Sequence, residues 1–246
     1  MPENPKMVGS GLVSARVQTG PCPNHCPECY YNGPDGKGLG YCENIFEPHI
    51  PTPEEAMGKL VRMNDGHDSN ISRDLVMATA RELIRQGARG AYMNTSIPRF
   101  DFEDGQGGKF PVIFTCNGRQ PVFVDDCPKN LMAVRLRWNS WEHGAQAALV
   151  HHYLDRRVPV IITPMRYREP WAMPPDAREH DYEWRQHILN PYWCVRPELL
   201  KRKVDALMAS FHYSRELVLC EGRCAECGNC ARLYKQCVLC GCGYGH

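Results

Sequence analysis

The spacing of apolar residues along the chain predicts strands that alternate with helices. In the first apolar stretch, 12–18, Val13, Ala15 and Val17 fall on one face of an extended segment. The fully apolar run 158–163 is typical of a strand that is buried on both faces of a parallel sheet. The predicted strands cover residues 12–18, 90–94, 111–116, 132–138, 158–163 and 217–219.

Helices are expected between most of these strands. The stretch 72–86 places Val76, Ala80 and Leu83 on one face, as an amphipathic helix does. Further helices are expected to begin near Thr52 and Asn139, and to cover 197–211. Alternating strands and helices indicate an α/β fold with a mostly parallel sheet, whose ligands bind at the carboxyl ends of the strands.

Two segments break this alternation. Residues 101–109 are acidic and glycine-rich, which predicts a loop. Residues 164–195 combine proline, tryptophan, tyrosine and arginine, and they are expected to be irregular. Aromatic and arginine side chains can stack on bases and contact phosphates. They can equally pack as a lid over the mouth of a barrel.

Composition narrows the classes of protein to consider. The formal net charge is +1, so no overall field favours nucleic acid or an anionic membrane. The chain begins with a polar segment and contains no apolar run of about 18 residues, so we expect a cytoplasmic protein without a membrane anchor. Its 14 cysteines therefore indicate metal or cluster ligands. The alternative is a secreted disulfide protein.

The first cysteine group lies directly after the first predicted strand. It reads Cys22-Pro-Asn-His-Cys26-Pro-Glu-Cys29. Three thiolates within eight residues can hold one cubane cluster and leave its fourth iron without a protein ligand. A structural zinc ion would need a fourth ligand, which His25 or Cys42 could supply.

This loop resembles the C-x3-C-x2-C loop of the radical SAM superfamily. The resemblance implies a partial (β/α) barrel in which Cys22, Cys26 and Cys29 hold a [4Fe–4S] cluster. It also implies that S-adenosylmethionine (SAM) chelates the open iron and is cleaved after one-electron reduction, which yields a 5′-deoxyadenosyl radical. An electron donor such as flavodoxin or ferredoxin is then expected, together with a substrate that the sequence does not identify. Family members usually carry an aromatic residue where this chain has Glu28.

Polar residues at the ends of the predicted strands are the candidates for binding SAM. They are Asn94, Thr95, Asn117, Arg135, Arg137, Asn139 and Ser140. Arg135 or Arg137 could bind the SAM carboxylate through a bidentate fork, although both could also be solvated strand residues. The family often has Gly-Gly-Glu after its second strand. Counting 90–94 as that strand puts Met93-Asn94-Thr95-Ser96 there, without the glycines or the carboxylate.

The second cysteine group lies at the other end of the chain. Its members are Cys220, Cys224, Cys227, Cys230, Cys237, Cys240 and Cys242. The spacing of Cys224, Cys227 and Cys230 is that of bacterial ferredoxin loops, which predicts a second iron–sulfur cluster with all its irons ligated. The alternative is a zinc knuckle in which Cys227 and Cys230 combine with Cys237 and Cys240.

The sequence therefore predicts a radical SAM enzyme with two parts. Residues 1–215 would form the α/β core, a partial (β/α) barrel, and residues 216–246 a small cysteine-rich module. The alternative function is a zinc-binding module for nucleic acid or protein, which the nearly neutral charge disfavours for nucleic acid.

Overall fold

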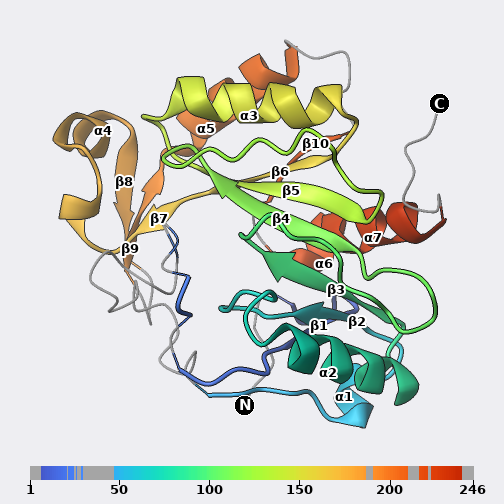
Figure 1. Cartoon of the computed structure of the whole chain (residues 1–246). Helices are drawn as coiled ribbons and strands as arrows, with labels where there is room; N and C mark the ends of the chain where they lie inside the picture. Colours follow the sequence, from blue (N-terminus) through green and yellow to red (C-terminus); the bar gives the residue numbers. More distant parts are fainter. Residues whose placement is uncertain are drawn as a thin grey trace.

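A seven-stranded parallel sheet organises the computed structural model of this protein (Figure 1). The structure describes residues 7–20, 22–24, 26, 29, 47–186, 191–209, 216–220 and 223–239. The strands are, in their order across the sheet, β1 (Leu12–Ala15), β2 (Leu60–Met63), β3 (Gly90–Thr95), β4 (Val112–Asn117), β5 (Leu131–Trp138), β6 (Val160–Pro164) and β10 (Leu217–Leu219). Every neighbouring pair is parallel.

The order of the strands identifies the fold class. They follow one another across the sheet as they do along the chain, and the edge strands β1 and β10 do not pair within the described residues. An open, sequentially wound parallel sheet with helical crossovers is the arrangement of a partial (β/α) barrel. The predicted α/β fold class is thereby confirmed.

One face of the sheet carries the larger hydrophobic core. Alternate strand residues such as Val61, Ala91 and Leu136 point into it and are fully buried. The helices that cover this face are α2 (Arg73–Arg85), α3 (His143–Asp155) and α5 (Pro197–Ala209). Figure 1 shows α3 and α5 side by side. We call this face the outer face.

The opposite, inner face is covered by the carboxy-terminal segment. Leu60, Tyr92 and Ile161 belong to its smaller core, into which Leu233 and Cys237 pack from α7 (Asn229–Leu239). The segment between β10 and α7 contains the short helix α6 (Cys224–Cys227). Because β10 is a strand of the main sheet, the predicted boundary at 215/216 crosses one continuous structure and does not separate two cores.

One strand of the main sheet was missed by the sequence prediction. β2 contains four residues and lies directly after α1 (Pro53–Ala56), so its apolar alternation is too short to be distinctive. The capping box expected at Thr52 is present, since Thr52 Oγ1 accepts a hydrogen bond from the Glu55 backbone at 3.3 Å. With β2 counted, the stretch predicted as the second strand becomes the third.

The segment 164–195 is more regular than predicted. It contains β7 (Arg166–Tyr167), the 3-10 helix η1 (Pro170–Ala172), α4 (Pro175–His180), β8 (Tyr182–Arg185) and β9 (Tyr192–Val195). The three strands form an antiparallel sheet in the order β7–β9–β8, stabilised in part by the cross-strand pair Trp184 and Trp193. Among the described residues, no helix is long and apolar enough to span a bilayer.

Candidate functional site

The chain leaves β1 directly into the first cysteine group. Cys22 and Cys29 are 7% and 9% exposed, and the Cys29 N–H donates to the Cys26 carbonyl at 3.2 Å. Burial raises the pKa of Cys22 to about 11, whereas hydrogen bonds from the backbone of Asn24 and Asp68 lower it. Those two N–H groups favour the thiolate, the form that binds metal.

Polar contacts join this loop to the end of β3. The Asn24 side-chain amide donates to Ser96 Oγ at 2.8 Å and to Cys26 Sγ at 3.1 Å, and Cys26 Sγ lies 2.9 Å from Ser96 Oγ. Burial raises the pKa of Cys26, and Ser96 and the positive charge of Arg137 on β5 oppose that rise. The loop thus lies at the carboxyl edge of the sheet, near residues from β3 and β5.

A buried carboxylate organises the same edge. Asp68 is 3% exposed and accepts hydrogen bonds from the Ser96 N–H at 2.7 Å, Ser96 Oγ at 2.9 Å, Thr95 Oγ1 at 2.8 Å and the Asn70 N–H at 2.9 Å. Asp68 was not predicted as a site residue. It follows β2, the strand that the apolar pattern did not reveal.

Recognising β2 also corrects the comparison with the family's Gly-Gly-Glu position. The segment after the second strand is 64–68, not Met93–Ser96, and it contains Gly66 with the carboxylates of Asp65 and Asp68. A glycine and carboxylates are therefore present after the second strand.

Four of the predicted strand-end residues lie at this edge. Arg135 Nη1 donates to Asn94 Oδ1 at 3.1 Å, and the Asn94 amide donates to the Met63 carbonyl at 2.8 Å. Thr95 binds Asp68, as described above. Arg137 is on the same face of β5 as Arg135, and its charge acts on Cys26.

Of the other three predicted residues, Asn117 and Asn139 serve local structure. Asn117 Oδ1 accepts a hydrogen bond from the Gln120 N–H at 2.8 Å, which closes a turn. Asn139 Oδ1 accepts from the Glu142 N–H at 2.9 Å and from Gln146 Nε2 at 3.0 Å, so its side chain stabilises the start of α3. Ser140 Oγ is buried and makes no hydrogen bond within the described residues.

The second cysteine group lies on the inner face. Cys220, Cys224 and Cys230 pack against the smaller core, and Cys227 Sγ accepts a hydrogen bond from the Asn229 side chain at 3.0 Å. Cys237 is buried and disulfide-bonded, so its sulfur is not available as a metal ligand in this structure. The predicted ligands Cys240 and Cys242 lie outside the described residues, as do His25 and Cys42.

The donor chemistry of the first group suits a soft, thiolate-bound metal. None of its three thiols is in a disulfide and two are buried; burial raises the pKa of Cys22 and Cys26, while hydrogen-bond donors at both and the charge of Arg137 at Cys26 oppose that rise. In this conformation, no three His, Cys, Asp or Glu side chains of the described part of the chain are grouped closely enough to hold one ion. Binding a cluster therefore requires the side chains of Cys22, Cys26 and Cys29 to converge.

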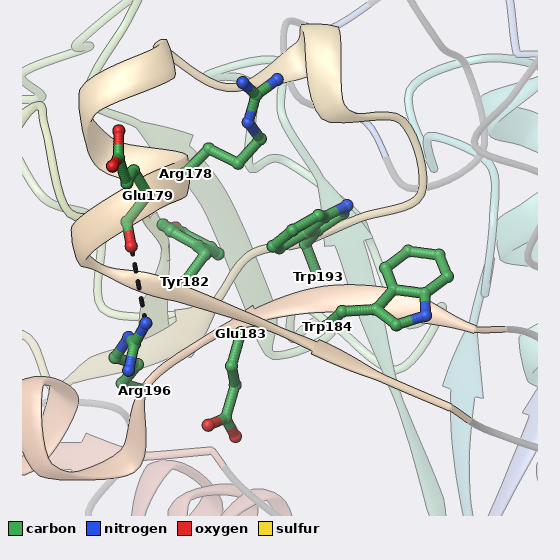
Figure 2. Close-up of a pocket in the computed structure, with 7 residues that line it drawn as sticks. All are labelled: Arg178, Glu179, Tyr182, Glu183, Trp184, Trp193 and Arg196. Atoms are coloured by element: carbon green, nitrogen blue, oxygen red, sulfur yellow. Dashed lines mark hydrogen bonds between the residues drawn. The ribbon is translucent and has the colours of Figure 1, made fainter.

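A shallow pocket with no cysteine in its lining lies at α4 and the antiparallel sheet (Figure 2). Its volume is about 430 Å³, and it is lined by Arg178, Glu179, Tyr182, Glu183, Trp184, Trp193 and Arg196. Arg196 donates to the Glu179 carbonyl at 3.5 Å. Residues 166–196 contain five arginines and five acidic residues, so the exposed tryptophans do not lie in a basic field. Of the two interpretations of this segment, phosphate binding therefore has no electrostatic support.

Comparison with known proteins gives one structural likeness. No family model matches the sequence, and no curated protein matches it. A solved structure of a spore photoproduct lyase mutant, with bound AdoMet and a dinucleoside spore photoproduct, is similar with a TM-score of 0.46 and 11% identity. The likeness covers 85% of this chain and 82% of that chain. At this TM-score it has no bearing on the roles of individual residues.

Proposed function

We propose that this chain is a radical SAM enzyme that holds a [4Fe–4S] cluster on Cys22, Cys26 and Cys29. The observation that supports this most is the position of the three-cysteine loop. It follows β1 at the carboxyl edge of an open parallel sheet, where ligands of such folds bind, and it contacts Ser96 at the end of β3. Three cysteines leave one iron open for a small molecule.

The neighbouring strand ends supply the groups that SAM would need. When bound, the reduced cluster would supply the electron that cleaves the sulfonium of SAM. Arg137 would bind the SAM carboxylate, because its charge already acts at Cys26. The segment 64–68 would receive the SAM amino group, since it follows the second strand and carries Asp65. Flavodoxin or ferredoxin would be the electron donor.

The proposal is tested by anaerobic reconstitution with iron and sulfide, followed by reduction with dithionite in the presence of SAM. We expect brown protein that forms 5′-deoxyadenosine. The triple variant Cys22→Ala/Cys26→Ala/Cys29→Ala should form none. Cys127→Ser is the matched control, because Cys127 is a half-buried free thiol that bonds to the Val124 carbonyl at 3.2 Å. SAM cleavage retained in the triple variant, or colourless protein with zinc alone, would contradict the proposal.

A further inference from the structure

Three thiols of the second cysteine group, Cys220, Cys224 and Cys230, pack against the inner-face core, and Cys227 lies between them along the chain. Cys220 follows β10, Cys224 and Cys227 are the first and last residues of α6, and Cys230 lies in the first turn of α7. All four are free. Gly228, in the left-handed conformation with φ 61°, turns the chain between the two helices.

The four thiols influence one another electrostatically, although, as at the first group, no three of them are grouped closely enough in this conformation to hold one ion, so binding a cluster requires them to converge. Burial raises the pKa of Cys220, and charges on Cys230 and Cys227 raise it further, while Arg135 lowers it. Burial likewise raises the pKa of Cys224, with further contributions from Cys230, Cys220 and Cys227. Three of them also pack against one hydrophobic core.

A separate observation points to a missing partner at this position. Tyr92 projects from β3 onto the inner face, is completely buried, and lies beside Cys230. Its hydroxyl makes no hydrogen bond of ordinary geometry. A buried hydroxyl without a partner is destabilising. A thiolate at Cys230 would accept a hydrogen bond from this hydroxyl, because O–H groups donate readily to anionic acceptors.

Two cations lie near the same thiols. Arg62 on β2 and Arg135 on β5 both act on Cys220, and Arg62 also acts on Cys224. Several thiolates in one buried site carry a negative charge that needs such compensation. The neighbouring groups are thus arranged for an anionic centre.

We propose that Cys220, Cys224, Cys227 and Cys230 are the four ligands of a second [4Fe–4S] cluster on the inner face of the sheet. The cysteines occur as C-x3-C-x2-C-x2-C, which contains the ferredoxin spacing. The zinc knuckle that pairs Cys227 and Cys230 with Cys237 and Cys240 is disfavoured, because Cys237 is disulfide-bonded. Four protein ligands leave no open iron, so this cluster does not bind SAM and serves electron transfer.

Strand β5 connects the proposed second cluster with the first cysteine group. The charge of Arg135 acts on Cys220 and that of Arg137 on Cys26, and the two arginines are two residues apart on the same face of β5. Their α-carbons are therefore about 7 Å apart along the strand. One strand thus carries a cation that acts on each cysteine group, which is consistent with electron transfer between the two clusters inside the protein.

The test uses the full chain with Cys22, Cys26 and Cys29 replaced by alanine, so that iron at the second group is read alone. After anaerobic reconstitution we expect about half the wild-type iron and, on reduction, an electron paramagnetic resonance (EPR) signal that SAM does not change. Adding Cys224→Ala or Cys230→Ala should remove that iron. Adding Cys240→Ser/Cys242→Ser, the matched control in the same tail, should leave it.

A second variant keeps the test decisive if ligand removal unfolds the tail. Tyr92→Phe retains the buried ring and removes the hydroxyl. Loss of the hydroxyl should make the midpoint potential of the second cluster more negative, because hydrogen bonds to ligand sulfur stabilise the reduced state. Iron lost with Cys240→Ser/Cys242→Ser but kept with Cys224→Ala, zinc in place of iron, or an unchanged potential in Tyr92→Phe would overturn the assignment.

These measurements separate this proposal from the proposed function. If the first group holds no cluster, wild-type protein and the triple alanine variant will contain the same iron, and 5′-deoxyadenosine will be absent from both. The tail variants will still report on the second cluster. Conversely, wild-type SAM cleavage with no iron left in the triple alanine variant would reject the second cluster alone.

Discussion

The two cysteine groups are held to the same sheet by different forces. The first is attached at the strand edge through polar contacts that run from Asn24 to Ser96 and on to Asp68. The second is attached to the inner face through apolar packing of α7, with Leu233 at its centre. Hydrogen bonds depend on direction and charge, whereas apolar packing depends on volume. The two attachments should therefore fail under different substitutions.

The difference also fits the chemistry proposed for each group. A cluster that binds a small molecule needs an accessible side, and a loop held by a few polar contacts at an edge leaves one. A cluster with four protein ligands needs enclosure, and the space between α7 and the sheet provides it. Each of the following substitutions tests one attachment while leaving the other in place.

Replacing Asp68 should have the largest effect. Asp68→Ala leaves the donors of Ser96, Thr95 and Asn70 without their buried acceptor, which should lower the free energy of unfolding by about 3–5 kcal/mol. The midpoint of thermal unfolding should fall by roughly 10 °C, as measured by circular dichroism. SAM cleavage should be lost while the tail keeps its iron.

Asp104→Ala is the matched control for this experiment. Asp104 also accepts backbone hydrogen bonds, from Gln106 at 2.8 Å and Gly108 at 3.0 Å, but in an exposed loop. Its replacement should cost less than about 1 kcal/mol. Equal losses in the two variants would show that Asp68 does not hold the first cysteine group in place.

Asp68 shows where sequence reasoning stopped. The strands with long apolar runs, the carboxyl edge and the Cys22 loop could all be placed from the pattern, because periodicity and parallel winding determine them. β2 is four residues long, so it carried too little signal, and the loop after it stayed unassigned. The missing strand also shifted the count, which moved the expected Gly and carboxylate position from 64–68 to Met93–Ser96.

The carboxy-terminal segment shows a second reason why the sequence did not predict the whole structure. Its cysteine spacing could be recognised, but nothing in the spacing indicated which face of the sheet it would cover. That is decided by Leu233 and Tyr234 packing against β3 and its neighbours, a long-range contact that has no local pattern. Likewise Trp184 and Trp193 form a cross-strand pair that their positions in an apparently irregular segment did not reveal.

The two arginines of β5 provide the next test, because their charges act on different cysteine groups. Arg137→Gln should weaken SAM binding by about ten- to a hundredfold, the effect of losing a charge-assisted bond of roughly 1.5–3 kcal/mol. Arg135→Gln should change SAM affinity less and should make the potential of the second cluster more negative, since a nearby cation is lost. Equilibrium binding and redox titration measure the two effects. The same loss of SAM affinity in both variants would contradict the division between the groups.

Gly90→Ala tests the attachment of the tail. A Cβ at Gly90, the first residue of β3, would collide with the hydroxyl of Tyr234 on α7. The tyrosine has to swing away from the Ala91 backbone, to which it is hydrogen-bonded, at a cost of about 1–2 kcal/mol. Iron at the second group should fall, while SAM cleavage persists. Tyr234→Phe in the Gly90→Ala background should restore part of the loss, because it removes the colliding atom. No rescue would show that α7 does not pack as described.

The smallest effect is expected at Asn139, and it defines where the SAM-binding edge ends. The sequence placed Asn139 among the SAM-binding candidates, yet its side chain closes the turn before α3 and bonds to Gln146. Asn139→Ala should therefore lower the free energy of unfolding by about 1 kcal/mol, the usual net contribution of a hydrogen bond. SAM affinity of the folded protein should stay within about twofold of wild type, a change below roughly 0.5 kcal/mol. Asn139→Asp keeps an acceptor for the Glu142 N–H and should recover stability, although its charge lies close to the Glu142 carboxylate. Urea unfolding at equilibrium and SAM titration separate the two quantities. A tenfold loss of SAM affinity with unchanged stability would place Asn139 in the SAM site and extend that site beyond Arg137 to the start of α3.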